Sequence, residues 1–206
     1  MASVIAPFLA GFALSAALIV AIGAQNLFVL GQGLRREHVG AVVLFCGAAD
    51  ALLIVLGVAG VGSAVAAAPG LARALALAGA LFLGWHGVRA FGRMAVPEAM
   101  AAGAGTALPL GRVMAATAGF TFLNPHVWLD TVMLMGVAGS AVPAGLRAWF
   151  VLGAASASFA WFAALGYGAR LLAPVLARPG AWRVLDGLVG ATMLALAASL
   201  ALQAFS

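Results

Sequence analysis

The chain has 206 residues, of which 66% are apolar and only 7% charged, and its mean hydropathy is +1.17. A water-soluble domain needs far more charge to cover its surface, so this composition excludes one. The formal net charge of +5 comes from arginine; in a membrane protein such charge gathers in short loops, so it does not indicate nucleic-acid binding. The single cysteine, Cys46, excludes an intrachain disulfide and a metal site built from cysteines, and no cofactor is predicted.

Apolar runs of about 20 residues recur along the whole chain, and each is long enough to cross a bilayer core of about 30 Å as a helix. The sequence therefore predicts an all-α integral membrane protein with about six transmembrane helices. The predicted spans cover residues 7–30, 39–62, 71–91, 112–137, 146–172 and 182–203.

The connections between these spans are short except for residues 92–111, which are rich in Ala, Gly and Pro and read as a flexible linker. This linker divides a single transmembrane domain, residues 1–206, into three spans within 1–91 and three within 112–206. With three spans in each half, the second half starts on the opposite side of the membrane from the first. That arrangement predicts two inverted-topology repeats, a common plan in secondary transporters.

Arginines are distributed unevenly between the two sides of this topology. Eight of them fall on the first, third and fifth connections or their flanks, and two on the opposite side. Because cytoplasmic loops carry an excess of positive charge, we expect these three connections in the cytoplasm and both termini outside.

Two predicted spans are interrupted by polar residues. Gly23-Ala-Gln-Asn26 interrupts the first span, and Leu123-Asn-Pro-His126 interrupts the fourth, at the corresponding place in the second half. Pro125 has no N–H and disfavours helical geometry at Asn124, which frees backbone carbonyls on the preceding turn. Such a break is tolerated in a bilayer only where protein or water satisfies the freed groups, so it is either a simple kink or the lining of a cavity.

Two aspartates fall within the apolar spans. Asp50 is in the middle of the second span and Asp130 is within the fourth, one turn beyond His126. A mid-membrane aspartate costs about 2.5 to 3.5 kcal/mol on insertion scales, so a functional role is the first hypothesis for each. The alternative is structural: Asp50 would pair with a buried arginine or amide, and His126 would neutralise Asp130.

Together these features resemble the LysE/ArgO family of bacterial basic amino acid exporters, over essentially the whole chain. The motifs that carry the resemblance are Gly23-Ala-Gln-Asn26, its continuation Gln32-Gly-Leu-Arg-Arg-Glu-His38, Asp50, Asn124-Pro125-His126 and Asp130-Thr131. The resemblance implies a multi-pass secondary carrier in the bacterial inner membrane, not an enzyme, that exports L-arginine or L-lysine from the cytoplasm. The pathway residues that it implies are Gln25, Asn26, Asp50, Asn124, Pro125, His126 and Asp130.

A cationic substrate crossing a low-dielectric protein needs a counter-charge, which Asp50 or Asp130 can supply. The substrate carboxylate can meet amides or the positive N-terminal end of a half-helix. The same aspartate could hold a proton when the substrate leaves, which makes proton antiport a simple hypothesis. The expected partners are a basic amino acid, protons and the lipid bilayer, with a homo-oligomer left open.

Three alternatives remain at the level of the sequence. Exporters of neutral amino acids or related small metabolites share this plan and parts of these motifs. An intramembrane protease could use two aspartates, or a serine with a histidine, but no G-x-G-D pattern surrounds Asp50 or Asp130 and no G-x-S-G elbow is present. A scaffold subunit without a substrate would have little reason to keep two aspartates beside broken helices.

Overall fold

The computed structural model describes residues 3–20, 23–60, 69–95, 108–124, 127–172 and 179–205. All regular structure in these residues is helical, which confirms the predicted all-α fold. The elements are α1 (Ile5–Ile19), α2 (Ala24–Arg35), α3 (Val39–Val58), α5 (Pro69–Ala95), α7 (Leu110–Phe122), η1 (Trp128–Leu134), α9 (Met135–Ser140), η2 (Ala144–Leu146), α10 (Arg147–Gly168), η3 (Ala169–Leu172) and α12 (Pro179–Phe205).

The first predicted span is two helices rather than one. Helix α1 ends at Ile19 and α2 begins at Ala24, and the two axes are bent by 83°. Gly23, the N-cap residue of α2, is extended, with φ −103° and ψ 174°. The interruption predicted at Gly23 is therefore confirmed, and it is a sharp change of direction.

The fourth predicted span is also broken where proline requires it. Helix α7 ends at Phe122, Asn124 is not helical, and the chain resumes as the π-helix η1 followed by α9. Pro125 and His126 lie outside the described residues. The end of α7 before Asn124 follows from the steric effect of a proline on the residue before it.

Among the described residues, two helical segments are long and apolar enough to cross a membrane, 39–58 and 144–171, and the bent pair α1 and α2 makes a third if it counts as one span. Helices α5 and α12, at 27 residues each, occupy the third and sixth predicted spans. Each half of the chain thus has a broken helix followed by two long helices. The inverted-repeat relation between the halves remains a prediction.

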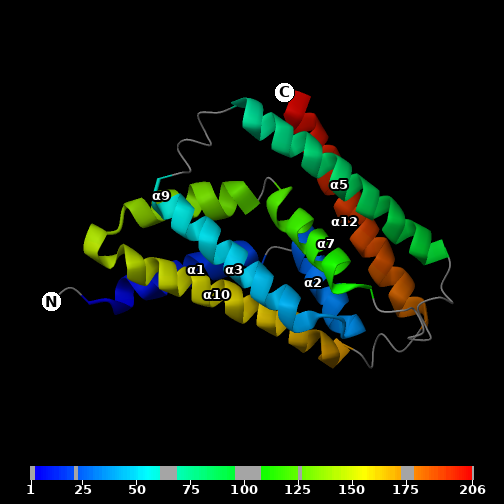
Figure 1. Ribbon diagram of the computed structural model, residues 1–206, viewed down its shortest axis with the longest axis horizontal. Helices are drawn as coiled ribbons and strands as arrows, with labels where there is room; N and C mark the ends of the chain where they lie inside the picture. The colour runs from blue at the N-terminus through cyan, green and yellow to red at the C-terminus, as the bar shows by residue number, and fades with distance from the viewer. Residues whose placement is uncertain are drawn as a thin grey trace.

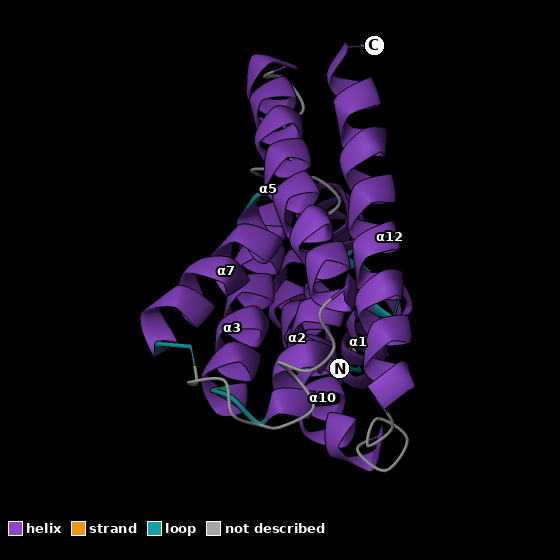
Figure 2. Cartoon of the chain, turned by 90° about the vertical axis from the view of Figure 1, so that its right-hand side faces the viewer, coloured by secondary structure: helices purple, strands orange, loops and turns teal. Residues whose placement is uncertain are grey.

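The helices form two groups joined by α2 and α7. Helix α10 packs along both α1 and α3, whereas α5 and α12 run antiparallel and side by side, extending beyond the other helices at one end (Figures 1 and 2). The short helices α2 and α7 contact both groups. The breaks that produce these short helices therefore lie in the interior of the molecule.

Glycines allow α1 and α10 to approach closely. A Cβ on Gly11 would overlap the carbonyl of Phe150, and one on Gly153 would overlap the carbonyl of Phe8. Small residues at such crossings let helix backbones touch, which is how helices commonly associate in membranes. This close packing fixes α10 against the first half of the broken span.

Candidate functional site

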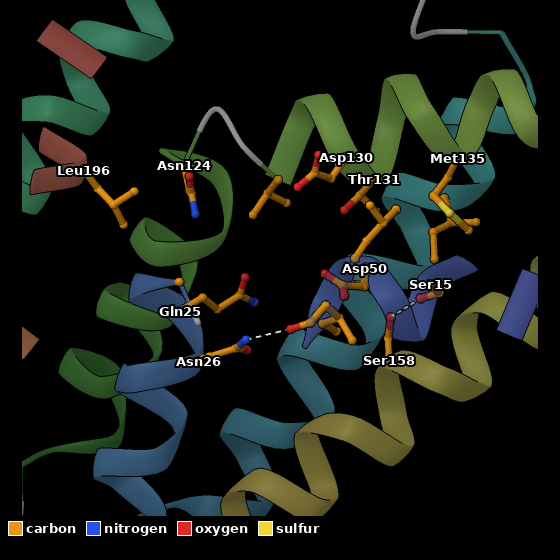
Figure 3. A pocket seen from close by; sticks show the side chains of 15 residues that line it. Ser15, Gln25, Asn26, Asp50, Asn124, Asp130, Thr131, Met135, Ser158 and Leu196 are labelled. Atoms are coloured by element: carbon orange, nitrogen blue, oxygen red, sulfur yellow. Dashed lines mark hydrogen bonds between the residues drawn. The ribbon is translucent and has the colours of Figure 1, made fainter. Parts of the chain in front are cut away.

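A cavity of about 260 Å³ lies where the two broken spans meet α3 and α10 (Figure 3). Its volume is just below the range of roughly 300 to 1,000 Å³ that is typical of small-molecule sites. Its polar lining residues are Ser15, Gln25, Asn26, Asp50, Asn124, Asp130, Thr131 and Ser158. Five of the seven predicted pathway residues are in this lining, and the other two, Pro125 and His126, lie outside the described residues.

Asp50 is the most enclosed acidic group of the cavity. It projects from α3 and is only 6% exposed. Within the described residues, the group beside its carboxyl is the hydroxyl of Ser158 on α10, rather than an arginine. The structural alternative of a buried arginine partner therefore finds no support in the described part of the chain.

A pair of serines adjoins Asp50. The hydroxyl oxygens of Ser15 on α1 and Ser158 on α10 are 3.4 Å apart, and both side chains are buried. Figure 3 draws Asp50 between this pair and the opposite wall. Sequence reasoning missed both serines because small hydroxyl residues in membrane helices are usually explained by helix packing.

Asp130 and Thr131 line the opposite wall from the π-helix η1. Single π-helical turns are rare and are found frequently at functional sites. The widened turn follows the break after Asn124, so Asp130 lies on irregular backbone, whereas Asp50 lies within the regular helix α3. No sequence pattern predicted the π-helix.

The amides of the first break hold the broken helix in place. The Asn26 side-chain N–H group donates to the Ile19 carbonyl at 2.7 Å, and the Trp161 indole N–H donates to the Asn26 side-chain oxygen at 3.3 Å. The Gln25 side-chain N–H group donates to the Thr121 hydroxyl at 3.1 Å. The first turn of α2 is thereby tied to α1, α7 and α10, a network in which sequence reasoning missed Thr121 and Trp161.

The N-terminal end of α2 opens at the cavity. Gly23 lines the cavity, and no side chain caps the first turn of the helix. The first N–H groups of a helix have no partner within it and carry the positive end of the helix dipole. This end of α2 can therefore receive an anionic group, while Asp50 and Asp130 can receive cationic ones.

A membrane-type chain whose interior cavity lies between two broken helices has the architecture of a secondary transporter. Comparison with known proteins identifies the family: residues 16–204 match the family described as LysE type translocator. The chain belongs to this family, and it is a membrane-embedded transport protein rather than an enzyme.

Several curated relatives cover nearly the whole chain. YggA of Aeromonas salmonicida is 45% identical over 196 residues, which cover 94% of each chain. The arginine exporter protein ArgO of Serratia proteamaculans is 40% identical over 204 residues, covering 98% of this chain and 99% of the relative. ArgO of Yersinia enterocolitica is 40% identical over 203 residues, covering 97% and 98%. No solved structure matches the chain significantly.

Proposed function

We propose that this protein exports basic amino acids, L-arginine or L-lysine or both, from the cytoplasm across the bacterial inner membrane. The observation that carries the proposal is Asp50, a carboxyl group enclosed in the cavity and next to a serine rather than an arginine. A buried carboxylate without a cationic partner is costly, and a cationic substrate removes that cost. The name of two relatives, arginine exporter, supports the same substrate class.

The cavity offers a complementary group for each charge of the substrate. Asp50 and Asp130 receive the two cationic groups, the side chain and the α-ammonium, while the N-terminal end of α2 beside Gly23 receives the α-carboxylate. A neutral amino acid has only one cationic group. It would therefore gain less from the two acidic side chains that line the cavity than a basic amino acid does.

Exchange for a proton makes export of a cation energetically feasible. Moving one positive charge out against an inside-negative potential costs about 2.3 kcal/mol per 100 mV. If Asp50 takes a proton from the outer side when the substrate leaves, and releases it to the cytoplasm when the next substrate binds, no net charge moves. The pH gradient then drives export.

Transport in proteoliposomes tests the proposal. Labelled arginine, lysine, threonine and leucine are supplied separately, and substrate flux and proton flux are recorded with and without a pH gradient. We expect flux of arginine and lysine only, with one proton moving in the opposite direction for each substrate. Flux of threonine or leucine at the rate of arginine would contradict the substrate class, and charge movement without proton flux would contradict the antiport.

A further inference from the structure

We propose that Gln32 and Glu37 form a second site for the cationic end of the substrate, at the expected cytoplasmic end of the pathway. An apolar layer separates this entry site from the cavity. The inference rests on the proposed function, because it takes the substrate to be a basic amino acid.

The first observation is two buried oxygen atoms without a donor. Oε1 of Gln32 and Oε2 of Glu37 have no hydrogen-bond partner among the described residues, and Gln32 is only 5% exposed. The Glu37 backbone N–H donates to the Gln32 backbone carbonyl at 3.2 Å, so the turn that ends α2 brings the backbones of the two residues together. Buried acceptors without donors are costly and rare, and they indicate a bound water, ion or ligand group.

The second observation is the position of this pair on α2. Gln25 lines the cavity, and Gln32 lies seven residues later, on the same face of the helix and about 10 Å along its axis. Val29 lies between them on that face and is fully buried. Along this face of α2, the order is therefore a polar residue at the cavity, then an apolar residue, then Gln32 beside Glu37.

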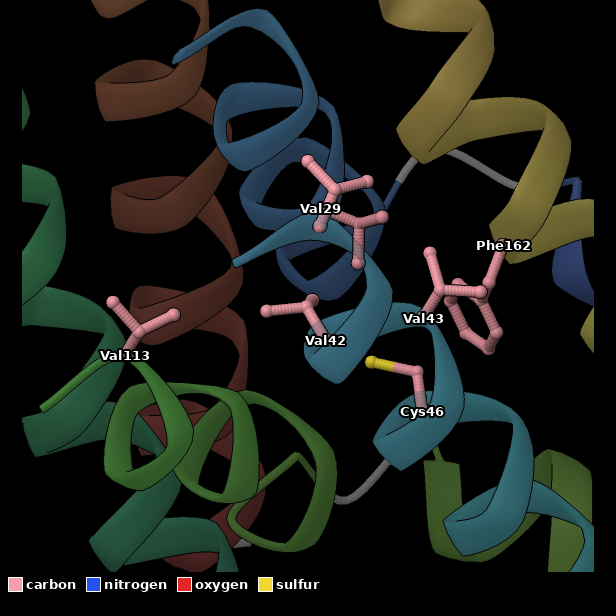
Figure 4. Close-up of a cluster of buried hydrophobic side chains, with 7 residues drawn as sticks. Val29, Val42, Val43, Cys46, Val113 and Phe162 are labelled. Carbon is pink, nitrogen blue, oxygen red and sulfur yellow. The ribbon is translucent and has the colours of Figure 1, made fainter. Parts of the chain in front are cut away.

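The apolar layer extends across neighbouring helices. Its buried members are Val29, Val39, Val42, Val43, Cys46, Val113 and Phe162 (Figure 4). On α3, Val42 precedes Asp50 by eight residues, about 12 Å along the axis, so the layer lies on the same side of the cavity on both helices. The layer closes the cavity on the expected cytoplasmic side. A substrate passes when the side chains of the layer move apart.

The chemistry of the pair favours a cation. Both atoms are acceptors, and Glu37 is anionic when ionised, so a ligand that binds them must supply hydrogen-bond donors and is best positively charged. A guanidinium carries five N–H donors and an ammonium three. The side chain of arginine or lysine therefore fits the pair. Binding at the pair removes hydration water from this side chain before the substrate reaches Asp50.

Transport from each face separately tests this site. The protein is reconstituted in one orientation, and the KM for labelled L-arginine is measured at the cytoplasmic face and at the opposite face. Glu37→Gln should raise the cytoplasmic KM about tenfold, as expected for loss of one hydrogen bond to a charged group. Gln32→Met should raise it severalfold, whereas Gln32→Glu, which adds a second carboxylate, should lower it. The KM at the opposite face should not change.

Two outcomes would overturn the proposal. An unchanged cytoplasmic KM in Glu37→Gln and Gln32→Met would show that the pair holds only water. Equal loss of rate at both faces, in Gln32→Glu as well as Gln32→Met, would show a purely structural role. Asp186→Asn, an acid-to-amide change at a buried residue of α12 that does not line the cavity, is the matched control. Absence of arginine flux in the unmodified protein would instead contradict the proposed function, and with it the ligand assigned here.

Discussion

Polar side chains have different surroundings in the α5 and α12 pair and around the broken helices. In the pair α5 and α12, His86 bonds to the Phe82 carbonyl of its own helix at 3.0 Å and packs against the ring of Phe120. Around the broken helices, by contrast, Asn26 bonds across a break and to another helix, and Asp50 faces a cavity. An unbroken helix satisfies its own backbone, whereas a break exposes backbone groups that polar side chains or a ligand must satisfy. The breaks therefore mark the proposed transport site.

The largest expected effect comes from Asp50, which faces the cavity between the broken helices. Asp50→Asn keeps the size of the side chain but removes the counter-charge for the substrate, so we expect efflux of preloaded arginine from cells to fall at least about a hundredfold. Asp186→Asn, outside the cavity, should retain efflux. Membrane content of both variants is checked by immunoblot, and normal efflux by Asp50→Asn would remove this residue from the mechanism.

A smaller effect is expected where a hydrogen bond only positions the break. Trp161→Phe removes the donor to Asn26 but keeps an aromatic ring, and one such bond contributes about 0.5 to 1.5 kcal/mol. We expect the maximal rate of arginine transport to fall about threefold to tenfold while the affinity for arginine stays within about twofold. If binding weakens as much as the rate, Trp161 does more than hold α2 in place.

The smallest effect is expected on the unbroken side. His86→Phe removes a side-chain bond within α5 and keeps a ring beside Phe120, so transport should stay within about twofold of the unmodified protein. Initial rates of arginine uptake provide the measurement. A loss as large as that of Asp50→Asn would erase the distinction between the two groups of helices.

The sequence predicted the class of fold and the positions of both breaks because their causes are local. Proline ends a helix at the residue before it, and aspartate in an apolar span is costly enough to stand out. Five predicted pathway residues were therefore found together in the cavity lining, although their roles remain proposals.

What the sequence did not predict depends on tertiary packing. Ser158 and Trp161 lie in an apolar helix where either could serve packing alone, and only the fold brings them to Asp50 and Asn26. The 83° bend between α1 and α2 and the π-helix η1 likewise follow from contacts between distant segments. For the same reason, only the structure could show that the buried oxygens of Gln32 and Glu37 have no hydrogen-bond partner among the described residues.

The central claim is that Asp50 binds the cationic group of the substrate in this cavity. It is tested most directly by equilibrium binding of labelled L-arginine to the purified protein and to Asp50→Asn. We predict saturable binding by the unmodified protein, displaced by lysine and not by leucine, and loss of binding in Asp50→Asn while Asp186→Asn still binds. Arginine binding by Asp50→Asn with unchanged affinity would contradict the claim.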